Sequence, residues 1–237
     1  MISDVKPWGR WATLGLGIIA LLTGQLAALT ALIWWTGQGL AHWPDMAGNG
    51  VVATLVICIS TPVQLLLLAL MAQRTRASAA EYLGLTLPRK RDVVYGIIAA
   101  LIFIVVIDGI SRLSDRNIVT QFQRDIYRTA STAGWLPWLW LAVVVVTPIG
   151  EETLFRGFLF RGWHRSPRDA WFAIAVIALL WAVIHLQYNL YVIAQVFVCG
   201  LMFGWVRFMS GSTILTMLLH GLVNFEGLLE TYLALHS

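Results

Sequence analysis

Two acids, two imidazoles and one amide lie within strongly apolar stretches of the last third of the chain. They are Glu151, Glu152, His185, His220 and Asn224. An ionisable side chain in a membrane-spanning segment is costly, so its presence there indicates a function. A carboxylate beside an imidazole can take a proton from water, and preorganised N–H donors can stabilise an oxyanion. These residue types therefore indicate acid–base hydrolysis within a membrane.

The two glutamates differ in the partners that a helix offers them. Glu152 precedes Arg156 by four residues, the favourable order for an ion pair, and pairing lowers the cost of burying both charges. Glu151 lies about 100° further round the helix. We expect it to face another helix and to act as a general base. Pro148 and Gly150 should loosen this helix just before the glutamates and free backbone groups.

Helical periodicity groups the other polar residues into pairs. Trp181 and His185 are four residues apart and share a helix face, as do His220 and Asn224. Lipid penalises an amide side chain, so an Asn one turn from a buried histidine indicates that both face one polar cavity. We expect three separate helices to bring these groups together, at or beyond the membrane midplane from the N-terminal side.

The elements that position these residues must be membrane helices. Only 12% of the 237 residues are charged, whereas a soluble domain usually has about a quarter. The apolar residues form long runs, and backbone in lipid must satisfy itself as helix. The sequence therefore predicts an all-α polytopic membrane helix bundle of about seven transmembrane helices, within a range of six to eight. The predicted spans are 11–35, 51–72, 93–111, 137–160, 170–187, 190–208 and 212–233.

One segment between the spans, 112–134, is too polar to cross a membrane. Its apolar residues recur at helical spacing, with arginines between them. This pattern predicts an interfacial amphipathic helix. Near it, Asp108 is interpreted as an interfacial residue, and Glu226 and Glu230 as solvated or paired residues near the C-terminal end.

Basic residues predict the orientation and localisation. Excluding Arg156, eleven Lys and Arg residues fall on the N-terminal side of the predicted spans and four on the other. This asymmetry predicts a cytoplasmic N-terminus and, with the short loops, a bacterial plasma membrane. The net charge of +4 comes from these loops and does not indicate nucleic-acid binding. One domain, 1–237, is expected, with its catalytic core at 135–237. The eleven are Lys6, Arg10, Arg74, Arg76, Arg89, Lys90, Arg91, Arg161, Arg165, Arg168 and Arg207, and the four are Arg112, Arg116, Arg124 and Arg128.

Three motifs in a fixed order resemble those of the CPBP family of type-2 CAAX prenyl endopeptidases and bacteriocin-processing or immunity proteins. The motifs are Glu151-Glu152-x-x-x-Arg156, Trp181-x-x-x-His185 and His220-x-x-x-Asn224, within about the last 90 residues. The chain departs from the family pattern at Trp181, where the family usually has Phe.

The resemblance implies a glutamate-dependent intramembrane endopeptidase without a cofactor. In this interpretation Glu151 and His185 activate a water, while His220 and Asn224 form an oxyanion hole. Glu152 and Arg156 would hold the first carboxylate in place. The implied partners are the lipid bilayer and a membrane-associated peptide or protein substrate, with no nucleic acid.

Three alternatives remain from the sequence. A glutamate and two histidines can ligate zinc, although they would come from separate helices and no His-Glu-x-x-His motif is present. A non-catalytic immunity or binding protein could keep the same polar site. A proton-coupled transporter could use Glu151 and His185 as a relay, but the chain is short and has no inverted repeat.

Overall fold

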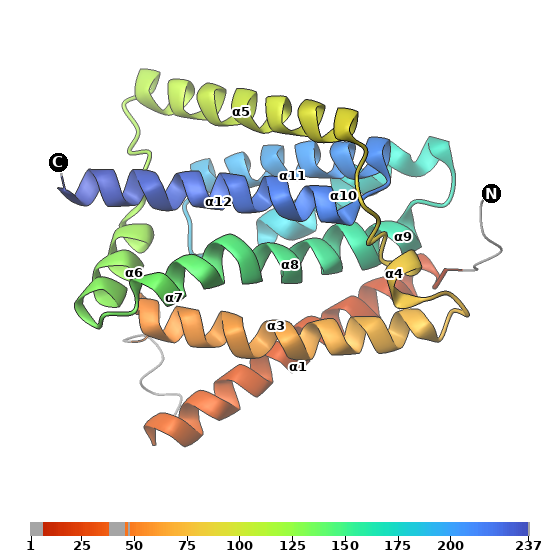
Figure 1. Cartoon of the computed structure of the whole chain (residues 1–237), viewed down its shortest axis with the longest axis horizontal. Helices are drawn as coiled ribbons and strands as arrows, with labels where there is room; N and C mark the ends of the chain where they lie inside the picture. Colours follow the sequence, from red (N-terminus) through yellow and green to blue (C-terminus); the bar gives the residue numbers. More distant parts are fainter. Residues whose placement is uncertain (1–6, 38–45, 47, 237) are drawn as a thin grey trace.

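The computed structural model describes residues 7–37, 46 and 48–236 and shows a bundle of helices (Figure 1). Lys6 lies outside the described residues. The longer helices run side by side, and α6 lies across one end of the bundle. In chain order the elements are α1 (Arg10–Thr36), α3 (Gly50–Gln73), α4 (Ala79–Tyr82), α5 (Lys90–Leu113), α6 (Gln121–Thr132), α7 (Leu136–Leu141), η2 (Ala142–Val146), α8 (Thr147–Glu152), η3 (Thr153–Leu159), α9 (Phe160–Trp163), η4 (Pro167–Asp169), α10 (Ala170–Val183), α11 (Leu190–Ser210) and α12 (Thr213–His236).

The predicted all-α polytopic bundle is confirmed, but a count of seven transmembrane helices is not. Among the described residues, five helical segments are long and apolar enough to cross a membrane: α1, α3, α5, the stretch from α7 to α9, and α11. Helix α10 is apolar but has only 14 residues. Helix α12 is 24 residues long but is not among those five segments, and it carries the polar residues His220, Asn224, Glu226 and Glu230.

Side-chain caps in the sequence set where several helices begin. Asn49 and Asn189 accept hydrogen bonds from the first backbone N–H groups of α3 and α11. Thr120 and Gln123 form a reciprocal capping box at the start of α6. The predicted amphipathic helix within 112–134 is therefore present but shorter, because the capping box delays its start to Gln121.

The fourth predicted span is continuous but not uniformly α-helical. Two π-helical segments, η2 and η3, flank the six-residue α8, which carries both glutamates. Pro148 lies in the first turn of α8 and has no N–H to donate. The predicted loosening before the glutamates therefore takes the form of a π-helical segment, a variation often found at functional sites.

The two ends of the bundle differ in charge. Helix α1 begins at the end where α4 and α9 lie, and α12 ends at the opposite end, beside α6 (Figure 1). The arginines that precede α5 or surround α9 lie at the first end, whereas Arg112, Arg116, Arg124 and Arg128 belong to α5, α6 and the loop between them. The structure thus separates the basic residues as the sequence predicts.

Candidate active site

A cavity of about 440 Å³ contains most of the predicted site residues in its wall. Glu151 of α8, Trp181 of α10, His185, and His220 and Asn224 of α12 all line it. The lining continues through apolar residues of α3 and α5 to α6 and the segment before it. The cavity therefore extends from these polar groups towards the end of the bundle where α6 lies.

Glu152 and Arg156 form a fully buried ion pair beneath this cavity. Nη1 of Arg156 donates to Oε1 of Glu152 at 2.8 Å, and the two side chains are 1% and 0% exposed. Nη2 of Arg156 also donates to the carbonyl oxygen of Gly200 at 3.2 Å, which ties α11 to this span. The predicted pairing is present, and its carboxylate also accepts from Nδ1 of His220 at 3.0 Å.

Glu151 has a different partner. The indole N–H of Trp181 donates to Oε2 of Glu151 at 2.5 Å, across the α8–α10 contact. Among the described residues, neither imidazole is hydrogen bonded to Glu151 and no contact joins it to Arg156. Glu152 and Arg156 are therefore placed to hold His220, while Trp181 holds the first carboxylate. The prediction that Glu152 and Arg156 support Glu151 directly is not accompanied by a hydrogen bond or ion pair to Glu151 among the described residues.

His185 lies in the turn that follows α10, not in the helix. The predicted span 170–187 is too long, because α10 ends at Val183. Nδ1 of His185 lies 2.8 Å from the carbonyl oxygen of Trp181. A carbonyl can only accept, so we assign the proton to Nδ1, which leaves Nε2 of the neutral ring as an acceptor.

Asn224 donates a hydrogen bond to a backbone carbonyl of the irregular fourth span. Its Nδ2 donates to the carbonyl oxygen of Val143 in η2 at 2.9 Å. One turn earlier on α12, Gly221 lets the two helices approach, because a Cβ there would lie 2.7 Å from the carbonyl oxygen of Val144. The carbonyl oxygen of Val143 therefore accepts a hydrogen bond from α12, and Asn224 keeps a second amide hydrogen.

Tyr188 is a cavity residue that the sequence analysis did not identify. Its ring stacks near that of His185, with the centroids 6.2 Å apart. Its spacing of three residues from His185 was the available signal.

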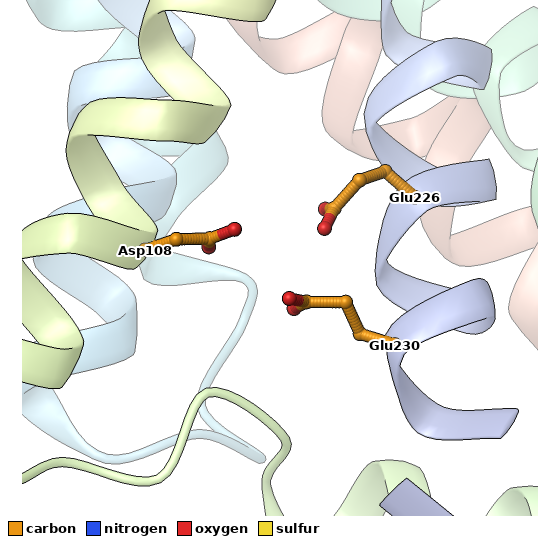
Figure 2. A group of neighbouring side chains, drawn as sticks. All are labelled: Asp108, Glu226 and Glu230. Carbon is orange, nitrogen blue, oxygen red and sulfur yellow. The ribbon is translucent and has the colours of Figure 1, made fainter. Parts of the chain in front are cut away.

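Three further carboxylates line the same cavity and form what we call the acidic cluster: Asp108, Glu226 and Glu230. Asp108 projects from α5 towards the two glutamates of α12 (Figure 2), and their oxygens lie within 4.8 Å of one another. Arg112 approaches Glu230 at 3.9 Å. The interpretation of Asp108 as an interfacial residue missed this grouping, because the grouping depends on packing between α5 and α12.

The geometry also bears on the zinc alternative. Within the part of the chain that is described, the acidic cluster is the group whose possible metal ligands approach one another this closely. The possible ligand atoms of Glu151, His185 and His220 do not all lie within 4.8 Å of one another.

Comparison with known proteins places this site in a family context. Residues 133–225 match the family model of type II CAAX prenyl endopeptidases, Rce1-like. The match confirms the resemblance to the CPBP family over this segment, which contains all three motifs. An uncharacterised 24.3 kDa protein of Escherichia coli is 35% identical over 91 residues, which make up 38% of this chain and 42% of that protein. No solved structure matches the chain.

Proposed function

With the match of residues 133–225 to an endopeptidase family as its premise, we propose that the protein is an intramembrane endopeptidase. It hydrolyses a peptide bond of a membrane-associated peptide that is lipidated or exported, and residues 135–237 form its catalytic core. One observation carries the proposal: Glu151, His185, His220 and Asn224 line a single cavity, although they come from separate parts of the chain.

Water activation is the role of Glu151 and His185. A water molecule between the Glu151 carboxylate and Nε2 of His185 can donate to both acceptors. Its oxygen attacks the scissile carbonyl carbon while Glu151 takes a proton as general base. When the C–N bond breaks, that proton passes to the leaving amine. The hydrogen bond from Nδ1 of His185 to Trp181 supports this assignment, because it turns the free ring nitrogen into an acceptor.

Oxyanion stabilisation is the role of His220 and Asn224. Asn224 has a second amide hydrogen beyond the one given to Val143. His220 donates from Nδ1 to Glu152, and a ring that carries both protons also donates from Nε2 to an oxyanion. Donors held in place before the reaction stabilise the developing charge strongly, and the buried Glu152–Arg156 pair holds His220 in this way.

The cavity's direction supports an exported or anchored peptide as the substrate. The wall of the cavity continues to α6, at the end of the bundle opposite to the start of α1. With the N-terminus in the cytoplasm of a bacterium, as the basic residues indicate, that end faces outwards.

The decisive experiment is the substitution Glu151→Gln, compared with Glu81→Gln on the exposed face of the short helix α4. Membranes from cells that carry each variant are searched by mass spectrometry for peptides that accumulate uncut. The purified proteins are then assayed in proteoliposomes on that peptide. Glu151→Gln should reach the membrane normally and cut at least about 100-fold more slowly, the usual size of a general-base effect. Glu81→Gln should match the unsubstituted protein.

The same material separates the alternatives. Unchanged biological activity of Glu151→Gln would favour a non-catalytic immunity or binding protein. Altered proton-coupled flux in the vesicles would favour a transporter. Activity that is lost with a chelator and returns with zinc would favour the metal-dependent protease.

A further inference from the structure

Trp181 is a tightly packed side chain of the site. It is 3% exposed and lies among four partners. The guanidinium carbon of Arg156 is 4.5 Å from its ring centroid, a cation–π distance. The rings of His220 and His185 meet it nearly edge-on at 5.3 and 5.2 Å, and Phe203 lies at 5.9 Å. These contacts fix the plane of the indole and the direction of its N–H.

Two polar groups of Trp181 reach the two residues proposed to activate water. The indole N–H donates to the carboxylate of Glu151, and the backbone carbonyl accepts from Nδ1 of His185. Glu151 is only partly buried, and this is the sole hydrogen bond to its carboxylate among the described residues. The tightly packed indole is therefore the fixed partner, and the carboxylate is the group that it positions.

We infer that Trp181 is a positioning residue that holds the Glu151 carboxylate in the cavity through its indole N–H, while its carbonyl orients His185. The inference rests on the proposed function. A phenylalanine at this position would keep the aromatic packing and the backbone carbonyl but could not donate to Glu151. The indole contact is thus a feature of this chain that the ring of a phenylalanine cannot supply.

The hydrogen bond can be tested without any substrate. The indole ¹H–¹⁵N resonances of the full-length protein are recorded in detergent micelles, and the Trp181 signal is assigned by its loss in Trp181→Phe. Glu151→Gln should move this signal to lower ¹H shift, because a bond to a neutral amide is weaker than one to a carboxylate. Glu230→Gln, which removes another carboxylate from the same cavity, should leave it in place. If the ¹H shift of the Trp181 signal does not change in Glu151→Gln, the inference is overturned.

Kinetics then test positioning. The peptide that accumulates in Glu151→Gln cells is cut with the unsubstituted protein to map the cut site, and an internally quenched peptide that spans this site is assayed with Trp181→Phe and Trp163→Phe. Trp163 is also buried, but its indole N–H has no hydrogen-bond partner among the residues that the structure describes, so Trp163→Phe controls for the loss of ring size. Trp181→Phe should lower kcat at least about tenfold with little change in KM, whereas Trp163→Phe should change neither.

The outcomes separate the two proposals. An unchanged kcat in Trp181→Phe overturns the positioning role while leaving the protease in place. Equal losses of kcat in both variants overturn it too, since they would reflect packing alone. If the unsubstituted protein cuts no peptide, the proposed function fails, and the positioning role for catalysis fails with it.

Discussion

Replacement of Arg156 by methionine should destabilise the protein strongly because it removes the permanently charged partner of Glu152 in the core and leaves only the hydrogen bond from His220. Arg156 is among the largest fully buried side chains, and its partner is 0% exposed. Methionine fills much of the same volume but gives no counter-ion to the carboxylate at 2.8 Å. The hydrogen bond from His220 does not replace the lost counter-ion, so the carboxylate stays buried without full charge compensation.

The expected loss follows from this burial. Breaking a buried ion pair by removing one partner typically costs about 3–5 kcal/mol of unfolding free energy. For a chain of this length, about 1 kcal/mol corresponds to roughly 2–4 °C in Tm, so Arg156→Met should lower the apparent Tm by about 10 °C. Removing the second charge should recover most of the loss. Glu152→Gln keeps an oxygen to which Nδ1 of His220 can donate, so the double variant should lie within about 2 kcal/mol of the original.

The assay is thermal unfolding of the four proteins of this double-mutant cycle in one detergent. The Arg10–Asp169 pair is the control, because its side chains are 37% and 32% exposed and its ions meet at 2.9 Å. Arg10→Met should cost less than about 1 kcal/mol, as partly exposed pairs do. If Arg156→Met costs no more than Arg10→Met, or if the two changes at the buried pair simply add, the reasoning from burial is wrong.

Three other predictions address packing, charge and orientation. Gly221→Ala should lower the free energy of unfolding by about 1–3 kcal/mol in a thermal assay, because the added Cβ would press on the carbonyl oxygen of Val144. Gly227→Ala is the control and should not destabilise the protein, because the nearest atom to its added Cβ lies at 3.7 Å. Equal losses in the two variants would contradict this reasoning. Glu226→Gln should raise Tm by about 2–4 °C near pH 7 by relieving repulsion in the acidic cluster, and the gain should vanish at a pH low enough to protonate these carboxyls; a gain that persists there would point to packing instead. Alkaline phosphatase, which is active only outside the cytoplasm, should be active when fused after α12 and inactive when inserted between α3 and α4, and the reverse result would invert the proposed orientation.

Local patterns in the sequence predicted the helices and the ion pair. Long apolar runs placed the predicted spans to within a few residues, apart from the end of α10. The spacing of Glu152 and Arg156 predicted their pairing, because residues four apart on a helix are neighbours whatever surrounds them. The match to a family model over residues 133–225 likewise follows from motifs that can be read directly.

Contacts between distant helices could not be predicted in this way. The hydrogen bond from Trp181 to Glu151 joins positions 30 residues apart and depends on how α10 packs on α8. The acidic cluster depends on α5 facing α12. The early end of α10 could not be predicted either, because no Gly or Pro follows Val183 to mark the end of the helix. The helix ends just before His185, whose side chain lines the cavity.

The shortness of α10 bears on how water could reach the proposed site within the membrane. Fourteen residues rise about 21 Å, some 9 Å less than the hydrocarbon thickness of a typical bilayer. If α10 begins at the edge of the hydrocarbon layer, the six-residue connection to α11 lies within the depth of the lipid tails, where non-helical backbone is stable only against protein or a hydrated space. His185, Gln187 and Tyr188 of this connection line the cavity. For the proposed endopeptidase, this connection would give water from the nearer membrane surface a route to Glu151 and His185 that does not cross the full apolar layer.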